Sequence, residues 1–396
     1  MGNPRNQTGW LALVSMFGLL LLSSCSPSQT SIGQSPPAVE EKPHIVQIES
    51  KMLFTGNSFW GRYIERAARR SDDPLAFPFA RFSEFDRESY DAWITGLECP
   101  VTEKGKDLSG EYMNETLVFN CDPEFVPEFA KWFDIVTLAN NHTDNMGASG
   151  FTETKNRLAE AGIQHFGHYE PEKLDELCEV VSIPVRVTYS DGKNDEAYLP
   201  IAMCGHHGVY RVPSKQSINV ISQYAQYMPV IAMPHSGAEY KPNSDSIKRR
   251  SYRAMIDAGA KVVLGDHPHW VQETEVHSGK LIVYSMGNFL FDQQGSLEVI
   301  RSAAISIDIK ATALDEKYKK SVERWLEIGE SCSTYQDDCL RKVETENLIP
   351  IDFSFTYDVV PANNRGYQPH PDKKLLKGIK QRLNWEKSMK DLQNVK

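Results

Sequence analysis

The chain has 396 residues, a formal net charge of −10 and no extended basic cluster. This charge excludes broad electrostatic contact with duplex nucleic acid, so we expect no nucleic-acid partner. About 370 residues follow the apolar N-terminal segment, which is enough for one large α/β domain or two average ones.

The N-terminus carries an apolar run, residues 10–22, preceded by Arg5. The run is too short to cross a bilayer comfortably, which favours a signal peptide. It ends in Leu22-Ser23-Ser24-Cys25, which resembles a bacterial lipobox, so residues 1–25 are predicted to be a lipoprotein signal peptide. Lipidation at Cys25 would anchor an extracytoplasmic protein to the cell membrane, with residues 26–43 as a disordered tether rich in serine and proline. The alternative is an ordinary signal peptide with an incidental cysteine.

From His44 onward, short apolar strands alternate with helical stretches. Strands are expected at 52–55, near 93–94, and at 134–138, 201–203, 230–233, 261–264 and 281–284. Helices are expected at 61–70, at 150–161 with Gly162 as its stop, and from an Asp245 cap to Ala258 with Gly259 as its stop. This alternation predicts an α/β fold.

The pattern changes after residue 296. Strands are predicted at 303–309 and 348–359, with a charged helix near 315–328 between them. These segments form either a second sheet of the same domain or a small appendage. We therefore assign one domain to residues 44–360 and a charged C-terminal tail, with a peripheral helix from 371, to residues 361–396.

Six cysteines follow Cys25, an even number in a chain predicted to be exported. Cys332 and Cys339 are the best disulfide candidates, because they close a short polar loop. Cys99 with Cys121 is a weaker candidate pair. Cys178 and Cys204 are expected to be free buried thiols.

Polar side chains recur at the ends of the predicted strands. The segment 262–269 is the clearest case, because an apolar run ends in Gly265 and then delivers His267 and His269. Alone, such a pair is more often a polar surface loop. Other predicted strands, however, are followed by residues of the same kinds, namely Asn57, Glu98, Asn141, His142, Asp144, His235, Glu239, Asn288 and Asp292. Imidazole, carboxylate and amide ligands that converge in this way favour Zn, Mn or Fe.

These segments resemble the CapA family of poly-γ-glutamate capsule synthesis proteins, within the calcineurin-like metallophosphoesterase superfamily. The matching motifs lie between Met52 and Asp292: Thr55-Gly56-Asn57 with Trp60-Gly61-Arg62, Leu97-Glu98-Cys99-Pro100 with Thr102, Leu138-Ala139-Asn140-Asn141-His142 with Asp144, His235-Ser236-Gly237-Ala238-Glu239-Tyr240, Gly265 to His269, and Tyr284-Ser285-Met286-Gly287-Asn288-Phe289. The resemblance implies a four-layer αββα sandwich of two mixed sheets, with a dimetal centre at the strand ends.

The resemblance also implies roles for individual residues. One or two divalent ions would be held by Asn57, Glu98, Asn141, His235, His267 and His269. His142 would donate a proton, oriented by Asp144. The predicted substrate contacts are Arg62, Glu239 and Asn288.

Three positions depart from the family pattern. Asn57 replaces the usual Asp, Gly96 replaces Asn, and Asp266 replaces His. An amide oxygen is a weaker metal ligand than a carboxylate, so the first metal site is expected to be loose or empty.

Two main functions follow. The first is a metal-dependent hydrolase acting on a polymer amide or a phosphoester, with an anionic polymer or phosphoester as substrate and capsule-synthesis membrane proteins as candidate partners. The alternative is a non-catalytic lipoprotein that binds the polymer or assists its export through a degraded metal site. In that case, the metal centre or the arginines near Arg62 supply positive charge. A third class is a structural lipoprotein that merely retains the fold.

Overall fold

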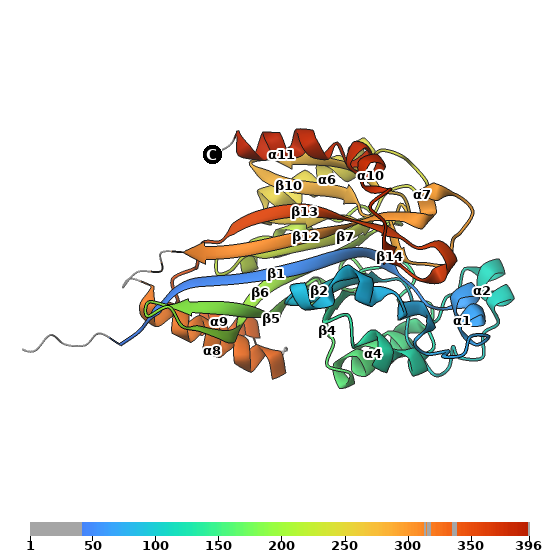
Figure 1. Cartoon of the computed structure of the whole chain (residues 1–396), viewed down its shortest axis with the longest axis horizontal. Helices are drawn as coiled ribbons and strands as arrows, with labels where there is room; N and C mark the ends of the chain where they lie inside the picture. The colour runs from blue at the N-terminus through green and yellow to red at the C-terminus, as the bar shows by residue number, and fades with distance from the viewer. Residues whose placement is uncertain (1–41, 313, 315–317, 335–338, 395–396) are drawn as a thin grey trace, which may run out of the picture. The chain divides into compact units, whose positions relative to one another are not determined.

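The computed structural model describes residues 42–312, 314, 318–334 and 339–394. The described residues from Pro43 onward form one compact unit (Figure 1). Its strands are β1 (Ile45–Ser58), β2 (Ala92–Leu97), β3 (Ile135–Thr137), β4 (Gln164–Phe166), β5 (Cys178–Tyr189), β6 (Asn194–Gly208), β7 (Val230–Ser236), β8 (Val262–Leu264), β9 (Gln272–His277), β10 (Lys280–Ser285), β11 (Asn288–Leu290), β12 (Arg301–Thr312), β13 (Ser354–Asn363) and β14 (His370–Pro371).

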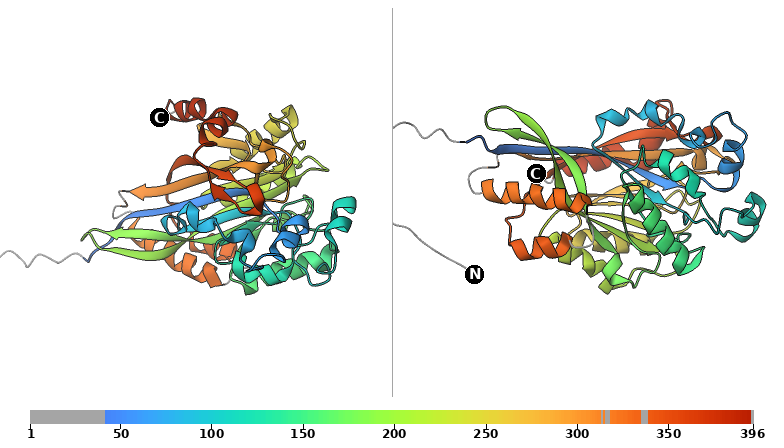
Figure 2. Two further views of the ribbon diagram at one scale, coloured as in Figure 1. Left: turned by 45° about the vertical axis from the view of Figure 1, so that its right-hand side comes forward. Right: turned by 90° about the horizontal axis from the view of Figure 1, so that it is seen from below.

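The α-helices of the same unit connect these strands or pack on their faces. They are α1 (Arg62–Ala68), α2 (Gly110–Thr116), α3 (Val126–Phe129), α4 (Gly147–Glu160), α5 (Lys215–Ala225), α6 (Ser246–Asp257), α7 (Leu297–Ile300), α8 (Lys319–Thr334), α9 (Cys339–Glu346), α10 (Leu376–Leu383) and α11 (Trp385–Gln393). Helices α8 and α9 lie against β5 and β6, and α10 and α11 lie against β9 and β10 (Figures 1 and 2).

The strands form one hydrogen-bonded network that branches at β1. The main path runs β14-β13-β12-β1-β5-β6-β7-β8-β10-β9, and β2, β3 and β4 leave it from β1. The first half of β1 pairs antiparallel with β5, whereas its second half pairs parallel with β2. Strands β12 and β13 therefore extend this network and are not a separate appendage.

Two apolar cores lie on opposite faces of β1. Met52 and Phe54 belong to the larger core, and the residue between them, Leu53, belongs to the second. The alternation follows from the two-residue period of a strand, and both faces are apolar because both are covered. The architecture confirms the predicted α/β sandwich of mixed strands and helices.

Local signals predicted the ends of two helices correctly. The side chain of Asp245 accepts hydrogen bonds from the backbone amides of Ile247 and Lys248, which caps α6. Gly162 and Gly259 adopt positive φ, 78° and 117°, immediately after α4 and α6. The left-handed conformation costs glycine no Cβ clash, so both helices end where predicted.

The expectation of free thiols at Cys178 and Cys204 is wrong. These residues face each other in the β5–β6 register and form a disulfide. The other bonds, Cys99–Cys121 and Cys332–Cys339, are the two candidate pairs. The β5–β6 hairpin, whose register brings Cys178 and Cys204 together, was not predicted from the sequence.

The C-terminal segment forms two helices that belong to the compact unit. Ile379, Leu383 and Trp385 are buried in the larger core, and the hydroxyl of Thr274 on β9 donates to the Leu383 carbonyl at 2.7 Å. The predicted domain boundary at residue 360 falls inside β13.

The predicted signal peptide, Cys25 and most of the tether lie outside the described residues. None of the helices in the described part of the chain combines the length and apolar character needed to cross a membrane.

Candidate functional site

The predicted site residues gather at the carboxyl ends of neighbouring parallel strands. The β1–β2, β2–β3, β6–β7 and β7–β8 pairs are all parallel, so these strand ends meet along one edge. Asn57 and Glu98 lie at the ends of β1 and β2, and Asn141 follows β3. His235 is in β7, and His267 follows β8.

The close approach of β11 to β1 also shapes this edge. A Cβ atom on Gly56 would lie 1.8 Å from the Gly287 carbonyl oxygen, so only glycine fits there. The close contact lets the backbone N–H of Asn57 donate a hydrogen bond to the Gly287 carbonyl oxygen at 3.2 Å. Asn57 is thereby fixed with its side chain fully buried.

Three ligand-type atoms meet at the centre of the site. His235 Nε2 lies 2.8 Å from Asn141 Oδ1 and 3.1 Å from His267 Nδ1. Two ligands at right angles around an ion with bonds of about 2.1 Å would be about 3 Å apart. Asn140 holds the other side of the His235 ring, with its Nδ2 3.3 Å from Nδ1. The contact with Asn140 Nδ2 puts the ring proton of His235 on Nε2, so His235 would release this proton when it binds an ion together with Asn141 Oδ1 and His267 Nδ1.

A second group forms around His269. Its Nδ1 lies 2.8 Å from Asn288 Oδ1, an acceptor, so this contact assigns the ring proton to Nδ1. The other ring nitrogen of His269, Nε2, then carries no proton, and it lies 3.8 Å from Glu98 Oε1. Glu98 Oε2 and Asn57 Oδ1 are buried and have no hydrogen-bond partner. Such orphaned oxygens are costly unless a cation or a donor satisfies them.

Both groups depend on amide oxygens. Within the described ranges, no set of three or more His, Cys, Asp or Glu side chains is arranged to hold a metal. Asn141 completes the first group and Asn57 contributes to the second, so amide oxygens are needed beside the imidazole and carboxylate ligands in both groups. The His235 and His267 ring centroids are 4.8 Å apart, and those of His267 and His269 are 6.0 Å apart.

The electrostatics of the site fit a divalent cation. Burial, then repulsion from Asp266, raises the pKa of Glu98 well above its usual value. Burial, then the neighbouring imidazoles, lowers the pKa values of His235 and His267 well below the usual range. A divalent ion would reverse the penalty on the carboxylates and favour neutral imidazoles, so the donor set fits a metal.

His142 is oriented by a residue that the sequence analysis did not select. Its Nδ1 lies 3.0 Å from Asn145 Oδ1, and its ring stacks on Phe119 with centroids 4.0 Å apart. Asp144 is exposed, so its predicted orienting role is corrected to Asn145. Burial lowers the pKa of His142 to about 4, so the ring is neutral at pH 7.

The three predicted substrate contacts lie in different environments. Arg62 is buried and makes a bidentate pair with Asp292, at 2.8 and 2.6 Å. Glu239 is half exposed, with Oε1 4.0 Å from His269 Nε2. Asn288 is fully buried, and its Oδ1 contacts His269 Nδ1. It therefore orients the His269 ring and is not exposed to a substrate. Glu239 is the member of this set that is open to a ligand.

Sequence reasoning missed His207 and noted Asp266 without assigning it a role. His207 pairs in register with His235 across β6 and β7, and its Nδ1 lies 2.6 Å from the Tyr169 carbonyl oxygen. It was missed because the predicted strand stops at Met203, whereas β6 continues to Gly208. Asp266 stands out in the sequence only as a departure from a motif. In the structure it is buried beside Asn57 and Gly96.

The position of these buried imidazole, amide and carboxylate groups, at the strand ends of an α/β sandwich, agrees with the metallophosphoesterase-like superfamily to which the motifs point. Residues 51–293 match the family described as bacterial capsule synthesis protein PGA_cap, and the chain belongs to that family. The resemblance inferred from the motifs is therefore confirmed.

Curated relatives carry names consistent with this family. "PGA biosynthesis protein CapA" of Bacillus subtilis is 24% identical over 61% of this chain and 63% of its own length. "Capsule biosynthesis protein CapA" of Bacillus anthracis is 24% identical, covering 66% and 64%. A "probable polyglutamine synthesis accessory protein" of Mycobacterium tuberculosis is 26% identical, covering 52% and 57%. The chain thus spans less than two thirds of the length of these relatives.

A solved structure, TT1561 of Thermus thermophilus, aligns with 64% of this chain and 93% of its own. Its sequence identity is 9% and its TM-score is 0.34, a similarity too low to support a conclusion.

Proposed function

We propose that this member of the capsule and poly-γ-glutamate biosynthesis family is a metal-dependent hydrolase of the cell envelope. The observation that carries the proposal is the approach of Asn141 Oδ1 and His267 Nδ1 to His235 Nε2, at 2.8 and 3.1 Å. Neutral imidazole and amide ligands, next to the buried carboxylate of Glu98, suit Mn, Zn or Fe.

The residues divide into holding and reacting groups. Asn141, His235 and His267 would hold one ion, and Asn57, Glu98 and His269 would hold a second. A bound ion would supply a hydroxide at neutral pH and stabilise negative charge on the reacting group. His142, whose Nδ1 contacts Asn145 and whose ring is neutral in the free protein, would exchange a proton at Nε2.

The substrate class follows from the names of the relatives and from the chemistry of the site. Proteins named for PGA biosynthesis support an anionic polymer with amide linkages, whereas the superfamily supports a phosphoester. Both bonds are cleaved by hydroxide attack with charge building on oxygen, so the site alone permits either. We place the polymer amide first.

The test is turnover by the purified protein loaded with Mn²⁺ or Zn²⁺. Poly-γ-glutamate and bis(p-nitrophenyl) phosphate are the two substrates, and His267→Ala is the site variant. His277→Ala is the matched control, because His277 is partly exposed and pairs with Asp257. We expect His267→Ala to lose at least 100-fold in turnover and the control to lose none. Turnover of neither substrate by metal-loaded wild type would reject the hydrolase.

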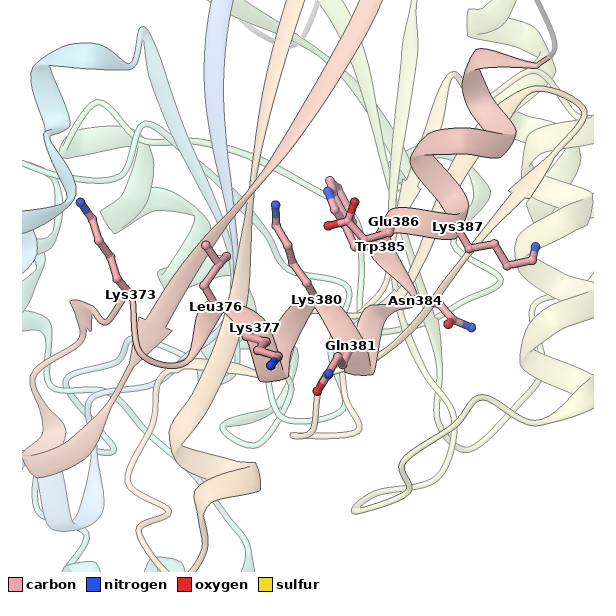
Figure 3. A pocket seen from close by; sticks show the side chains of 9 residues that line it. All are labelled: Lys373, Leu376, Lys377, Lys380, Gln381, Asn384, Trp385, Glu386 and Lys387. Atoms are coloured by element: carbon pink, nitrogen blue, oxygen red, sulfur yellow. The ribbon is translucent and has the colours of Figure 1, made fainter.

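The alternative, a polymer-binding protein without catalysis, is favoured by a separate basic groove. A cavity of about 760 Å³ beside α10 and α11 is lined by four lysines and one carboxylate, with apolar and neutral polar side chains between them (Figure 3): Lys373, Lys377, Lys380, Lys387, Glu386, Leu376, Trp385, Gln381 and Asn384. Lysines beside apolar side chains suit a flexible polycarboxylate. Their methylene chains can pack on the apolar side chains while their ammonium groups stay hydrated and attract the carboxylates. This local charge contrasts with the net acidity of the chain.

Binding of labelled poly-γ-glutamate would test the groove. Lys377→Glu/Lys380→Glu should weaken binding at least fivefold at low salt. Lys104→Glu/Lys320→Glu changes the net charge equally at exposed positions elsewhere, and should have a smaller effect. Equal losses in the two double variants would leave only a general charge effect and would count against the groove.

We further propose that Cys25 is lipidated and anchors the chain outside the cytoplasmic membrane, where capsule-synthesis membrane proteins would be its partners. The apolar run before Cys25 and the serine- and proline-rich segment after it support this. Cys25→Ala should release the protein from the membrane fraction or leave it unprocessed. Unchanged processing and fractionation would reject the anchor.

A further inference from the structure

The three departures from the family pattern lie together in space. Asn57 and Gly96 are register partners in the β1–β2 pair. A Cβ atom on Gly96 would lie 2.8 Å from Asp266 Oδ2 and 3.8 Å from Asn57 Oδ1. Three substitutions that are far apart in the sequence therefore occupy one point of the site.

Gly96 makes the room that Asp266 fills. A contact of 2.8 Å is closer than a real Cβ tolerates, so any side chain at position 96 would push the Asp266 carboxylate away. Asp266 also forms an isolated bridge with His235, which fixes its backbone beside the ligand group. The glycine at 96 and the carboxylate at 266 are thus one coupled change.

The Asp266 carboxylate is buried without full compensation. The residue is 4% exposed, and neither carboxylate oxygen has a hydrogen-bond partner of normal geometry. Burial disfavours its charged form more than the backbone amides of His267 and Asn57 and the ammonium of Lys248 favour it. A buried carboxylate in this state is neutralised, either by a bound cation or by a proton.

We propose that Asp266 supplies the carboxylate that Asn57 lacks to an ion held by Glu98 and His269. Without the ion, the side chains of Asp266, Glu98 and His269 are not arranged around one point, so binding would draw the Asp266 carboxylate toward the other two. The negative charge has moved from the end of β1 to the loop after β8, and the subsite keeps two carboxylates. This inference rests on the metal centre of the proposed function. It also replaces the expectation that the first metal site is loose or empty.

Lys248 offers the competing explanation. It is 3% exposed, its Nζ donates to Gln272 Oε1 at 3.1 Å, and burial lowers its pKa to about 7. If Asp266 serves only as a counter-ion to Lys248, its removal would change stability and leave metal binding untouched. If Asp266 serves the metal, removing the nearby positive charge with Lys248→Met would leave metal affinity unchanged or raise it.

The test measures metal stoichiometry and affinity, by elemental analysis after dialysis and by calorimetry with Mn²⁺. Wild type should bind two equivalents. Asp266→Asn, which keeps the shape and removes the charge, should lose one equivalent or weaken it at least 10-fold. Gly96→Ala should do the same by displacing the carboxylate.

The decisive variant moves the carboxylate back. Asn57→Asp in the Asp266→Asn background should restore the second equivalent, whereas Asn57→Asp alone should raise affinity less than twofold. Two equivalents at wild-type affinity in Asp266→Asn would overturn the inference while leaving the metal centre standing. A loss in Lys248→Met equal to that in Asp266→Asn would also overturn it. Wild type that binds no metal would reject the proposed function itself.

Discussion

The buried pair between Arg62 and Asp292 provides a sharp test of how the site is supported. The two side chains are 6% and 1% exposed, and two hydrogen bonds of 2.6 and 2.8 Å join them. The Arg62 guanidinium also lies over the Phe119 ring, 4.3 Å from its centroid. Asp292→Ala would leave the guanidinium buried without its anion, which costs about 3–5 kcal/mol.

The comparison variants separate charge from packing. Asp292→Asn keeps an acceptor at the same place and should cost less than Asp292→Ala. Arg62→Met/Asp292→Ala removes both charges and should be more stable than Asp292→Ala alone, because no unpaired charge remains. Urea denaturation of the metal-free protein, followed by far-UV circular dichroism, measures the free energies of unfolding. An exposed ion pair contributes at most about 1 kcal/mol to the free energy of unfolding. A loss below that value in Asp292→Ala would show that water reaches the Arg62 guanidinium, and it would contradict the reasoning.

Three further predictions concern the rest of the fold. Asn145→Ala should lower turnover about 10–100-fold with little change in metal content, because it frees the His142 ring; a matching loss of metal would contradict this. Replacing Cys178 and Cys204 by alanine should lower the free energy of unfolding by about 3.5 kcal/mol, because the bond closes a loop with a sequence separation of 26 residues. Mass analysis of the non-reduced wild type, before denaturation, checks that the bond exists, and free thiols there would refute the prediction. Burial lowers the pKa of His206 from 6.5 to about 4, so the folded state resists its protonation. The stabilising contribution of neutral His206 is therefore complete above pH 6.5 and is lost as pH falls toward 4, by up to about 3 kcal/mol. His206→Gln should lose stability less steeply over that range in chelator-treated protein, and parallel pH profiles would refute the assignment.

The elements with local signals could be predicted from the sequence. Apolar runs located β7 and β8, and the cap at Asp245 with the glycine at 259 bounded α6. The polar residues after these strands could be grouped because parallel strand ends share an edge. The candidate ligand set therefore follows from strand order and motif residues alone.

The rest depends on partners that are distant in sequence. The β5–β6 register, which joins Cys178 to Cys204, is set by a hairpin whose tip contains Asp191-Gly192, with Gly192 at φ 84°. This dipeptide is a hairpin signal that the sequence-based prediction did not use. Asn145 was missed because it is one residue beyond Asp144, and only the turn geometry decides which of them reaches His142. The fit of Asp266 into the space at Gly96 is a three-dimensional relation with no trace in either motif alone.

The central claim is that this edge of the sheet holds divalent metal. Diffraction from crystals soaked in Mn²⁺, with anomalous data collected near the manganese edge, tests it most directly. We predict one anomalous peak bounded by Asn141, His235 and His267, and a second beside Asp266 and His269. Well-ordered crystals with no anomalous peak at these residues, or with peaks elsewhere only, would contradict the account.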